Sequence, residues 1–144
     1  MRLTNYTDYS LRVLIYLATK PNEELSNIKE IADVYGISKN HLMKVIYDLG
    51  RLGYIETIRG RNGGIRLNKR PEDINIGEVI LQTEEDFHLV ECFHPEKNSC
   101  VISPVCSLKH ALNKALDAYI SVLKEYTLAD FIRNPDAYRE LFEK

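Results

Sequence analysis

The sequence predicts a mainly α-helical fold with a small β-hairpin, arranged as a winged helix-turn-helix unit followed by a long C-terminal dimerisation helix. Helical periodicity over most of the chain, a short β-forming stretch rich in glycine, and a regular apolar seam near the C-terminus predict this fold. The 144 residues suffice for one ordinary domain. We expect the winged helix-turn-helix at 1–83, a cysteine-bearing segment at 84–106, and the dimerisation helix with a C-terminal tail at 107–144.

Two helices are predicted before residue 36. Apolar residues at helical spacing run from Tyr6 to Lys20, with Thr4 or Asn5 as the N-cap, and they predict a first helix. Ser26 precedes the segment NIKEIADVY, whose apolar residues recur at helical spacing while Lys29 and Glu30 stay outside. This segment predicts a short second helix.

A third helix follows a tight turn and forms a helix-turn-helix with the second. Gly36 interrupts the helical pattern, and Ser38 then caps the segment KNHLMKVIYDLGRLG, which has one apolar face. In this motif the second helix enters the major groove of DNA. Asparagine can pair with adenine, lysine can donate to guanine or phosphate, and a capping serine can hold a phosphate. The candidates for contacts with double-stranded DNA are Ser38, Lys39, Asn40, His41, Lys44 and Tyr47.

A β-hairpin with a basic tip is predicted directly after this helix. The segments YIETIR at 54–59 and IRL at 65–67 have the composition of two short strands around a glycine-rich tip. Such a tip can follow the DNA backbone or reach into the minor groove, as the wing of a winged helix does. We expect Gly63 and Gly64 to supply a turn with positive φ. The candidate DNA contacts at the tip are Arg59, Arg61, Asn62 and Gly63.

The charge distribution favours DNA as a partner. Between Gly36 and Arg70 the chain has eight basic and two acidic residues, a net charge of +6. Residues 71–144 have seven basic and fourteen acidic residues, a net charge of −7. A basic face attracts phosphates whatever the base sequence, although a solvated charged surface would have the same composition.

Other function classes lack their sequence signals. No apolar run approaches the roughly 18 residues of a membrane helix, and the opening MRLTNYTDYS lacks the apolar stretch of a signal peptide. We therefore expect a cytoplasmic protein that does not contact a membrane. The chain has no P-loop, nucleophile elbow, dinucleotide fingerprint or HExxH pair, so we do not expect an enzyme.

The segment 84–106 loses helical periodicity and contains all three cysteines. Seven residues separate Cys92 from Cys100, and five separate Cys100 from Cys106. Zinc sites generally have closer cysteine pairs and four nearby ligands, so this spacing favours an iron-sulfur cluster whose fourth ligand is not cysteine. A redox disulfide, or three cysteines without a common role, are the alternatives. The candidates for the fourth ligand are His94, His110, Asp8 and Glu85.

The longest helical pattern follows Cys106 and has a heptad seam. Its apolar residues are spaced by four, three, four, three and four positions, and the helix is about 19 residues long. A seam this regular favours a homodimer, whereas packing within one chain would use the same stripe. The seam residues are Leu108, Leu112, Ala115, Tyr119, Val122 and Tyr126.

Several motifs together resemble the Rrf2 family of dimeric winged-helix regulators. They are the opening LTNYTDYSLRVLIYLA, the segment IKEIADVYGISKNHLMKVIYDLGRLGYIETIRGRNGGIRL, the following PEDINIGEVI, and the three-cysteine loop ahead of the long helix. The resemblance covers nearly the whole chain. The wing GRNGGIRL and the cysteine spacing are most similar to the branch of the family that represses transcription and responds to nitric oxide.

This resemblance implies a cofactor and a signal. It implies that the three cysteines bind a 4Fe-4S cluster, that nitric oxide attacks the cluster, and that affinity for the DNA operator then falls. It also implies a carboxylate from the first helix of the partner subunit as the fourth ligand, and the matching residue is Asp8. The branch that controls cluster assembly uses closer cysteines and a histidine three residues after the last one. That position is Lys109 here and the histidine is His110, so a 2Fe-2S cluster with His110, or a zinc or thiol switch, is the alternative.

Overall fold

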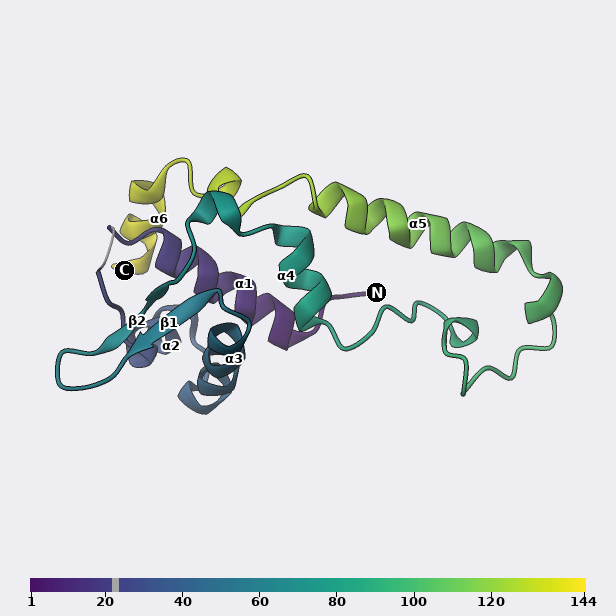
Figure 1. Cartoon of the computed structure of the whole chain (residues 1–144), viewed down its shortest axis with the longest axis horizontal. Coiled ribbons are helices and arrows are strands. Elements are labelled where there is room, and N and C mark those ends of the chain that lie inside the picture. Colours follow the sequence, from purple (N-terminus) through teal and green to yellow (C-terminus); the bar gives the residue numbers. More distant parts are fainter. Residues whose placement is uncertain (22–23) are drawn as a thin grey trace.

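The computed structural model describes residues 1–21 and 24–144 and has a compact body with one long arm (Figure 1). The predicted helix-rich architecture with one hairpin is confirmed. Its helices are α1 (Asn5–Ala18), α2 (Ile28–Tyr35), α3 (Lys39–Arg51), α4 (Ile76–Thr83), α5 (Ser107–Leu123) and α6 (Pro135–Phe142). Its strands are β1 (Ile55–Ile58) and β2 (Gly64–Leu67), and its 3-10 turns are η1 (Pro71–Asp73), η2 (Glu91–Phe93), η3 (Ser103–Val105) and η4 (Leu128–Phe131).

Side-chain caps fix where the first three helices begin. The hydroxyl of Thr4 accepts from the backbone N–H of Thr7 and starts α1. Asn27, not Ser26, caps α2, because its side chain forms a reciprocal capping box with Glu30. Gly36 ends α2 with a φ of 64°, a left-handed backbone conformation that favours glycine.

Ser26 has a different role from the one its position before α2 suggests. Its N–H donates to the carbonyl of Ile65 at 2.9 Å, and its own carbonyl accepts from the N–H of Ile65 at 2.8 Å. The antiparallel hairpin pairs Ile55 with Leu67 and Ile58 with Gly64. On the other side of β2, Ser26 forms an isolated antiparallel bridge with Ile65. The wing is thereby tied to the segment before α2.

The hydrophobic core lies between α1, α3, α4 and the base of the hairpin. Its fully buried side chains come from α1, α2, α3, α4 and η4, which surround the same interior. Burial of this apolar surface is the main stabilising contribution to the fold. The largest completely buried aliphatic side chains include Leu14, Ile31, Leu42, Leu49, Ile74 and Leu128.

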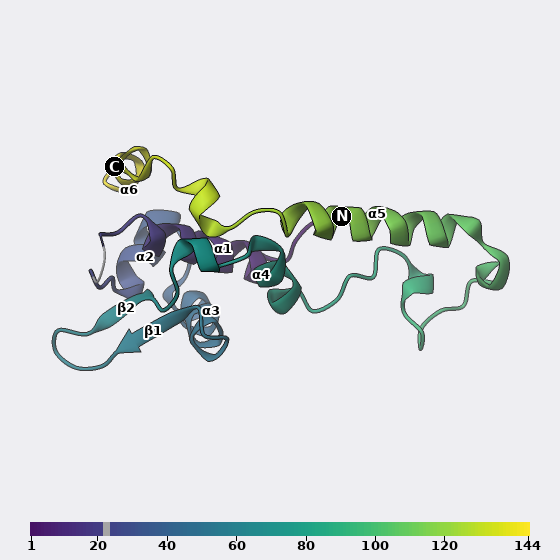
Figure 2. The same cartoon turned by 45° about the horizontal axis from the view of Figure 1, so that its top comes forward.

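The chain returns to the body after the arm. Figures 1 and 2 show α6 on the side of α1 opposite to α3 and the hairpin. The ring of Phe142 lies 5.0 Å from that of Tyr16 and 5.7 Å from that of Tyr35, and the Arg139 guanidinium donates to the carbonyl of Thr19 at 2.7 Å. The predicted C-terminal tail therefore contains a helix that supports the back of the helix-turn-helix.

The arm consists of α5 and the cysteine segment that runs beside it (Figures 1 and 2). The observed helix, Ser107–Leu123, has 17 residues and ends before the predicted seam does, so Tyr126 lies beyond it. None of its residues is buried. Within the described residues, no helix is long and apolar enough to cross a membrane.

Candidate nucleic-acid interface and cysteine segment

The outward face of α3 carries the side chains predicted to contact DNA. Leu42, Val45, Ile46 and Leu49 are buried against the body and orient the helix. The hydroxyl of Ser38 accepts from the N–H of His41 at 3.1 Å and so caps the helix. The predicted residues Ser38, Lys39, Asn40, His41, Lys44 and Tyr47 are all exposed.

Contacts from α1 hold this reading helix in place. The ring of Tyr9 lies edge-on against His41 with 4.8 Å between ring centroids. The hydroxyl of Tyr6 donates to the carboxylate of Asp48 in the last turn of α3, and Lys44 Nζ lies 5.8 Å from the Tyr6 ring centroid. Burial and the Asp48 carboxylate both raise the pKa of Tyr6, so its hydroxyl keeps the proton that it donates. These contacts fix the position of α3 relative to α1.

The wing needs its glycines for a different reason from the one expected. Gly60 has a φ of 110°, whereas Gly63 and Gly64 do not have positive φ, so the expectation for those two was wrong. A Cβ on Gly63 would lie 2.1 Å from the carbonyl oxygen of Ile58, and one on Gly64 would lie 2.8 Å from that of Ser26. Glycine is required at both positions by close backbone approach, which is across the hairpin for Gly63 and to the segment before α2 for Gly64.

The charges of the wing are divided between paired and unpaired arginines. Arg66 Nε lies 2.6 Å from Glu56 Oε1 across the two strands. Arg59 and Arg61 form no ion pair with any described residue, and both are exposed with Asn62 at the tip. Because α3 contacts β1, the wing starts beside the helix that carries the predicted DNA contacts.

The cysteine segment has its own hydrogen-bonded structure. The carboxylate of Glu91 accepts from the backbone N–H and the hydroxyl of Ser99, which lowers the pKa of Glu91. The side chain of Asn98 accepts from the N–H of Cys100 at 3.1 Å and donates to Ser103 at 3.0 Å. These links organise the stretch between the first and second cysteines.

All three cysteines are free thiols that solvent can reach. Cys100 is exposed, while Cys92 and Cys106 are partly exposed. Cys92 lines a pocket with Lys109 and Asn113 of α5, and Cys106 is the N-cap residue of that helix. In the described part of the chain, no three His, Cys, Asp or Glu side chains are gathered closely enough to hold a metal ion. The thiols have the chemistry of an iron-sulfur ligand set, and one chain alone does not assemble it.

The candidates for a fourth ligand lie in separate places. Asp8 on α1 forms an ion pair with Arg12, with 2.7 Å between Asp8 Oδ2 and the Arg12 guanidinium. His110 is exposed in the first turns of α5, and Glu85 is exposed at the start of the cysteine segment. The Nδ1 atom of His94 is buried and has no hydrogen-bond partner among the described residues, and the ring stacks on His88 at 4.9 Å. The structure does not bring any of the four into a cluster of ligands.

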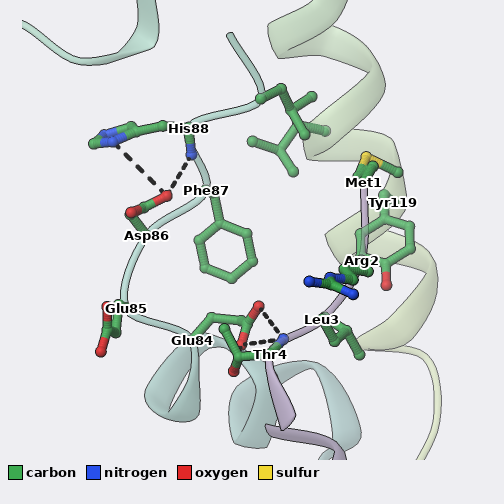
Figure 3. A pocket seen from close by; sticks show the side chains of 12 residues that line it. Met1, Arg2, Leu3, Thr4, Glu84, Glu85, Asp86, Phe87, His88 and Tyr119 are labelled. Atoms are coloured by element: carbon green, nitrogen blue, oxygen red, sulfur yellow. Dashed lines mark hydrogen bonds and ion pairs between the residues drawn. The ribbon is translucent and has the colours of Figure 1, made fainter. Parts of the chain in front are cut away.

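Glu84 connects the start of the cysteine segment to α1. Its carboxylate accepts from the backbone N–H of Thr4 at 3.1 Å (Figure 3). It also accepts from the hydroxyls of Thr4 and Thr7. A carboxylate at a helix N-terminus is favoured by the helix dipole. This clamp forms one wall of a pocket of about 360 Å³ that Phe87 and Tyr119 also line. The α1 turn that carries Asp8 is thereby anchored to the residue where the cysteine segment begins.

Two residues of this region were missed at the level of sequence. Met43 is 49% exposed on the outward face of α3, although its apolar side chain is surrounded by core positions in the sequence. Helical spacing from Asn40 and Tyr47 would have placed it outside. The role of Glu84 depends on a contact with a residue 80 positions away, for which the sequence has no local signal.

Comparison with known proteins agrees with this arrangement. The model of the Rrf2 family, described as an iron-dependent transcriptional regulator, matches residues 3–134. The HTH-type transcriptional regulator NsrR of Bacillus licheniformis is 72% identical over 141 residues, covering 98% of this chain and 99% of the relative. The protein of the same name from Bacillus subtilis is 66% identical, covering 99% of this chain and 98% of the relative.

A solved structure has the same fold. The structure of CymR, the global cysteine regulator of B. subtilis, is 26% identical, covers 91% of this chain and 95% of its own, and has a TM-score of 0.69. The reading helix, the wing and these relatives indicate a DNA-binding transcriptional regulator, not an enzyme. The chain belongs to the Rrf2 family.

Proposed function

We propose that this chain is a dimeric repressor whose affinity for a double-stranded DNA operator is set by a nitric-oxide-sensitive 4Fe-4S cluster. The thiolates of Cys92, Cys100 and Cys106 would hold the cluster, with Asp8 of the partner subunit as the fourth ligand. The position of the cysteine segment carries this proposal, because the segment joins the C-terminal end of α4 to the N-terminal end of α5. Any group bound by the thiols would lie in the arm beside α5, in the segment that links this helix to the winged helix-turn-helix at 1–83.

The donor set supports this assignment. Thiolates are soft ligands that suit iron-sulfur clusters, whereas a carboxylate is a hard and weaker ligand. Such a cluster would supply iron that reacts with nitric oxide, and the iron bound by the weaker carboxylate ligand would be the most accessible to it. The three thiols are free and accessible, and the side chain of Asp8 is partly exposed to solvent. Both observations are compatible with roles as cluster ligands. The resemblance of the wing and the cysteine spacing to the nitric-oxide-sensitive branch of the family favours the same reading.

The seam on α5 supports a homodimer. Leu108 is 63% exposed and Val122 is 51% exposed, and Tyr119 is also exposed on the same helix. Apolar side chains at heptad spacing usually pack against a second helix. A second copy of this chain is the occupant that explains both the exposed seam and the distance of Asp8 from a complete ligand set.

The chain has a path from Asp8 to the reading helix. Arg12, which pairs with Asp8, lies with its guanidinium carbon 5.8 Å from the Tyr9 ring centroid, and Tyr9 packs on His41 at the start of α3. The Asp8 carboxylate raises the pKa of Arg12 and holds its charge in place. When Asp8 turns from Arg12 toward the partner subunit, Arg12 and Tyr9 lose their present arrangement, and the orientation of His41 changes with them.

Anaerobic purification tests the proposal. We expect iron and acid-labile sulfide in equal amounts, near four of each per chain, and a brown absorption spectrum that zinc and disulfide forms lack. DNA affinity, measured at one salt concentration, should fall when nitric oxide is added. Asp8→Ala should alter the spectrum or the nitric oxide response, while Asp136→Ala, which removes an exposed aspartate of a similar ion pair on α6, should alter neither. A colourless protein whose DNA affinity is the same with and without nitric oxide would contradict the proposed cluster.

A 2Fe-2S cluster with His110 is the second candidate. Cys106 caps α5 and His110 lies one helical turn later, so the two side chains share a face of the helix. In that case, iron and sulfide should amount to two per chain. His110→Ala should then change the spectrum and Asp8→Ala should not. A zinc or thiol switch would give a colourless protein whose DNA affinity responds to chelator or oxidant.

A further inference from the structure

The arm leaves the body at a close contact between α4 and the end of α5. Gly77 lies in the first turn of α4, and a Cβ on it would lie 2.4 Å from Lys124 Cγ, 2.8 Å from Lys124 N and 2.9 Å from Lys124 Cα. Two of these atoms are backbone, so a flexible side chain cannot relieve the clash by moving away. Lys124 is the C-cap residue of α5. The two helices therefore touch at this point through a glycine that has no side chain.

Backbone hydrogen bonds close the same contact. Asn75 caps α4 with its side-chain oxygen, and its Nδ2 donates to the carbonyl of Lys124 at 2.8 Å. The N–H of Ile76 donates to the carbonyl of Tyr126 at 3.0 Å, and Asn75 pairs with Thr127 in a short antiparallel bridge. Unpaired N–H groups at the start of one helix thus bind carbonyls just after the end of the other. We call these residues, 75–77 with 124–127, the joint.

The joint lies at the opposite ends of α4 and α5 from the cysteine segment. The segment starts where α4 ends, at Glu84, and finishes where α5 begins, at Ser107. Figure 1 shows α5 extending from the joint away from the body while the cysteine segment returns along it. Among the described residues, one exposed ion pair lies beside the joint, with 3.2 Å between Lys124 Nζ and Glu78 Oε1. It contributes little to stability because both side chains are about half exposed.

We propose that the joint sets the angle between α5 and the reading head, and thereby the spacing of DNA half-sites that the dimer accepts. Gly77 is the positioning residue, because only glycine permits this approach of the two backbones. The proposal rests on the dimeric DNA binding proposed above and is independent of the type of cluster. In symmetric dimers, the distance between the two heads determines the half-site spacing.

The size of the effect follows from the geometry. Ordinary contact begins near 3.4 Å, so a Cβ that lies 2.8 Å from Lys124 N forces the joint open by about 0.6 Å. Across a helix separation of about 8 Å, this opening tilts α5 by about 4°. The 17 residues of α5 span about 26 Å, so its far end moves by about 2 Å. Two symmetric arms double this to about 4 Å, close to the rise of about 3.4 Å per base pair.

The test compares DNA spacing preferences. The wild-type protein first selects duplexes from a random library, and its paired half-sites are then moved apart or together one base pair at a time. Binding of the wild-type protein, Gly77→Ala, Asn75→Ser and Glu78→Ala to each duplex and to a single half-site is measured by fluorescence anisotropy. Serine retains the cap of α4 but cannot reach the Lys124 carbonyl. Glu78→Ala removes the exposed ion pair with Lys124 from a residue outside the joint and serves as the control.

The optimum spacing distinguishes the outcomes. We expect Gly77→Ala to move the optimum by about one base pair, Asn75→Ser to move or broaden it, and Glu78→Ala to leave it unchanged. Loss of stability alone lowers affinity at every spacing equally and does not move the optimum. If Gly77→Ala does not fold, Asn75→Ser decides the question. Folded, dimeric variants with the wild-type optimum would overturn the role of the joint, whereas selection of single half-sites by the wild-type protein would overturn the dimer itself.

Discussion

Arg59 and Arg61 at the tip of the wing are exposed cations that form no ion pair with a described residue. They differ in this from Arg66, which Glu56 neutralises at 2.6 Å. An unpaired arginine near DNA can neutralise a phosphate and release a bound counterion. We therefore predict that replacing Arg59 and Arg61 together by alanine weakens DNA binding at all base sequences alike.

The magnitude can be worked out from the number of contacts. Each phosphate contact contributes a slope of about −0.9 to the logarithm of affinity plotted against the logarithm of salt concentration. Between about 50 and 200 mM salt, each contact therefore changes affinity by about 3.5-fold. Loss of both arginines should make the slope less steep by about 1.8. The ratio of the affinity at about 50 mM salt to the affinity at about 200 mM salt should therefore be about twelvefold smaller than for the wild-type protein.

The assay is a salt titration of DNA affinity on one duplex. Arg66→Ala should change the slope by less than half as much as the double tip variant, because Glu56 already pairs with Arg66. Arg133→Ala removes the same charge at an exposed position between η4 and α6, and its slope should equal the wild-type value. If the double tip variant retains the wild-type slope, the wing does not contact phosphate and the reasoning fails.

Three further predictions concern stability. Leu128→Ala should lower the free energy of unfolding by about 2–5 kcal/mol, because the side chain is completely buried; urea denaturation measures it, and a loss below about 1 kcal/mol would contradict it. Gly63→Ala should cost about 1–3 kcal/mol by the same assay, because its Cβ meets the Ile58 carbonyl; an unchanged midpoint would exclude that clash. Hydrogen bonds, chiefly from the Thr127 N–H, lower the pKa of Asp130, so their stabilisation holds above the unfolded pKa and is lost as the pH falls through the lowered value. Asp130→Asn should therefore show a weaker acid dependence of the urea midpoint than the wild type, and an equal dependence would refute this assignment.

Local signals were sufficient for the elements of the reading head. Ser38 caps α3 as predicted, since an N-cap bonds within one turn of its own helix. Asn27 caps α2, and the residue before it, Ser26, pairs instead with Ile65 of the wing, which is a tertiary contact. The positive φ predicted for Gly63 and Gly64 was wrong, because the close backbone approaches of Gly63 to Ile58 and of Gly64 to Ser26 depend on which segments face each other.

The sequence by itself determined the order of α1, α2, α3 and α5, the basic residues of α3 and the wing, and the seam on α5, because periodicity and charge act over a few residues. Only the tertiary structure decided how the arm meets the body. The Glu84 clamp on α1 and the approach of Gly77 to Lys124 join residues 80 and 47 positions apart. Such contacts depend on where whole helices pack, and no local spacing encodes them. Among the described residues, Asp8 and the cysteines are likewise not gathered into one ligand set, because their placement also depends on how whole helices pack.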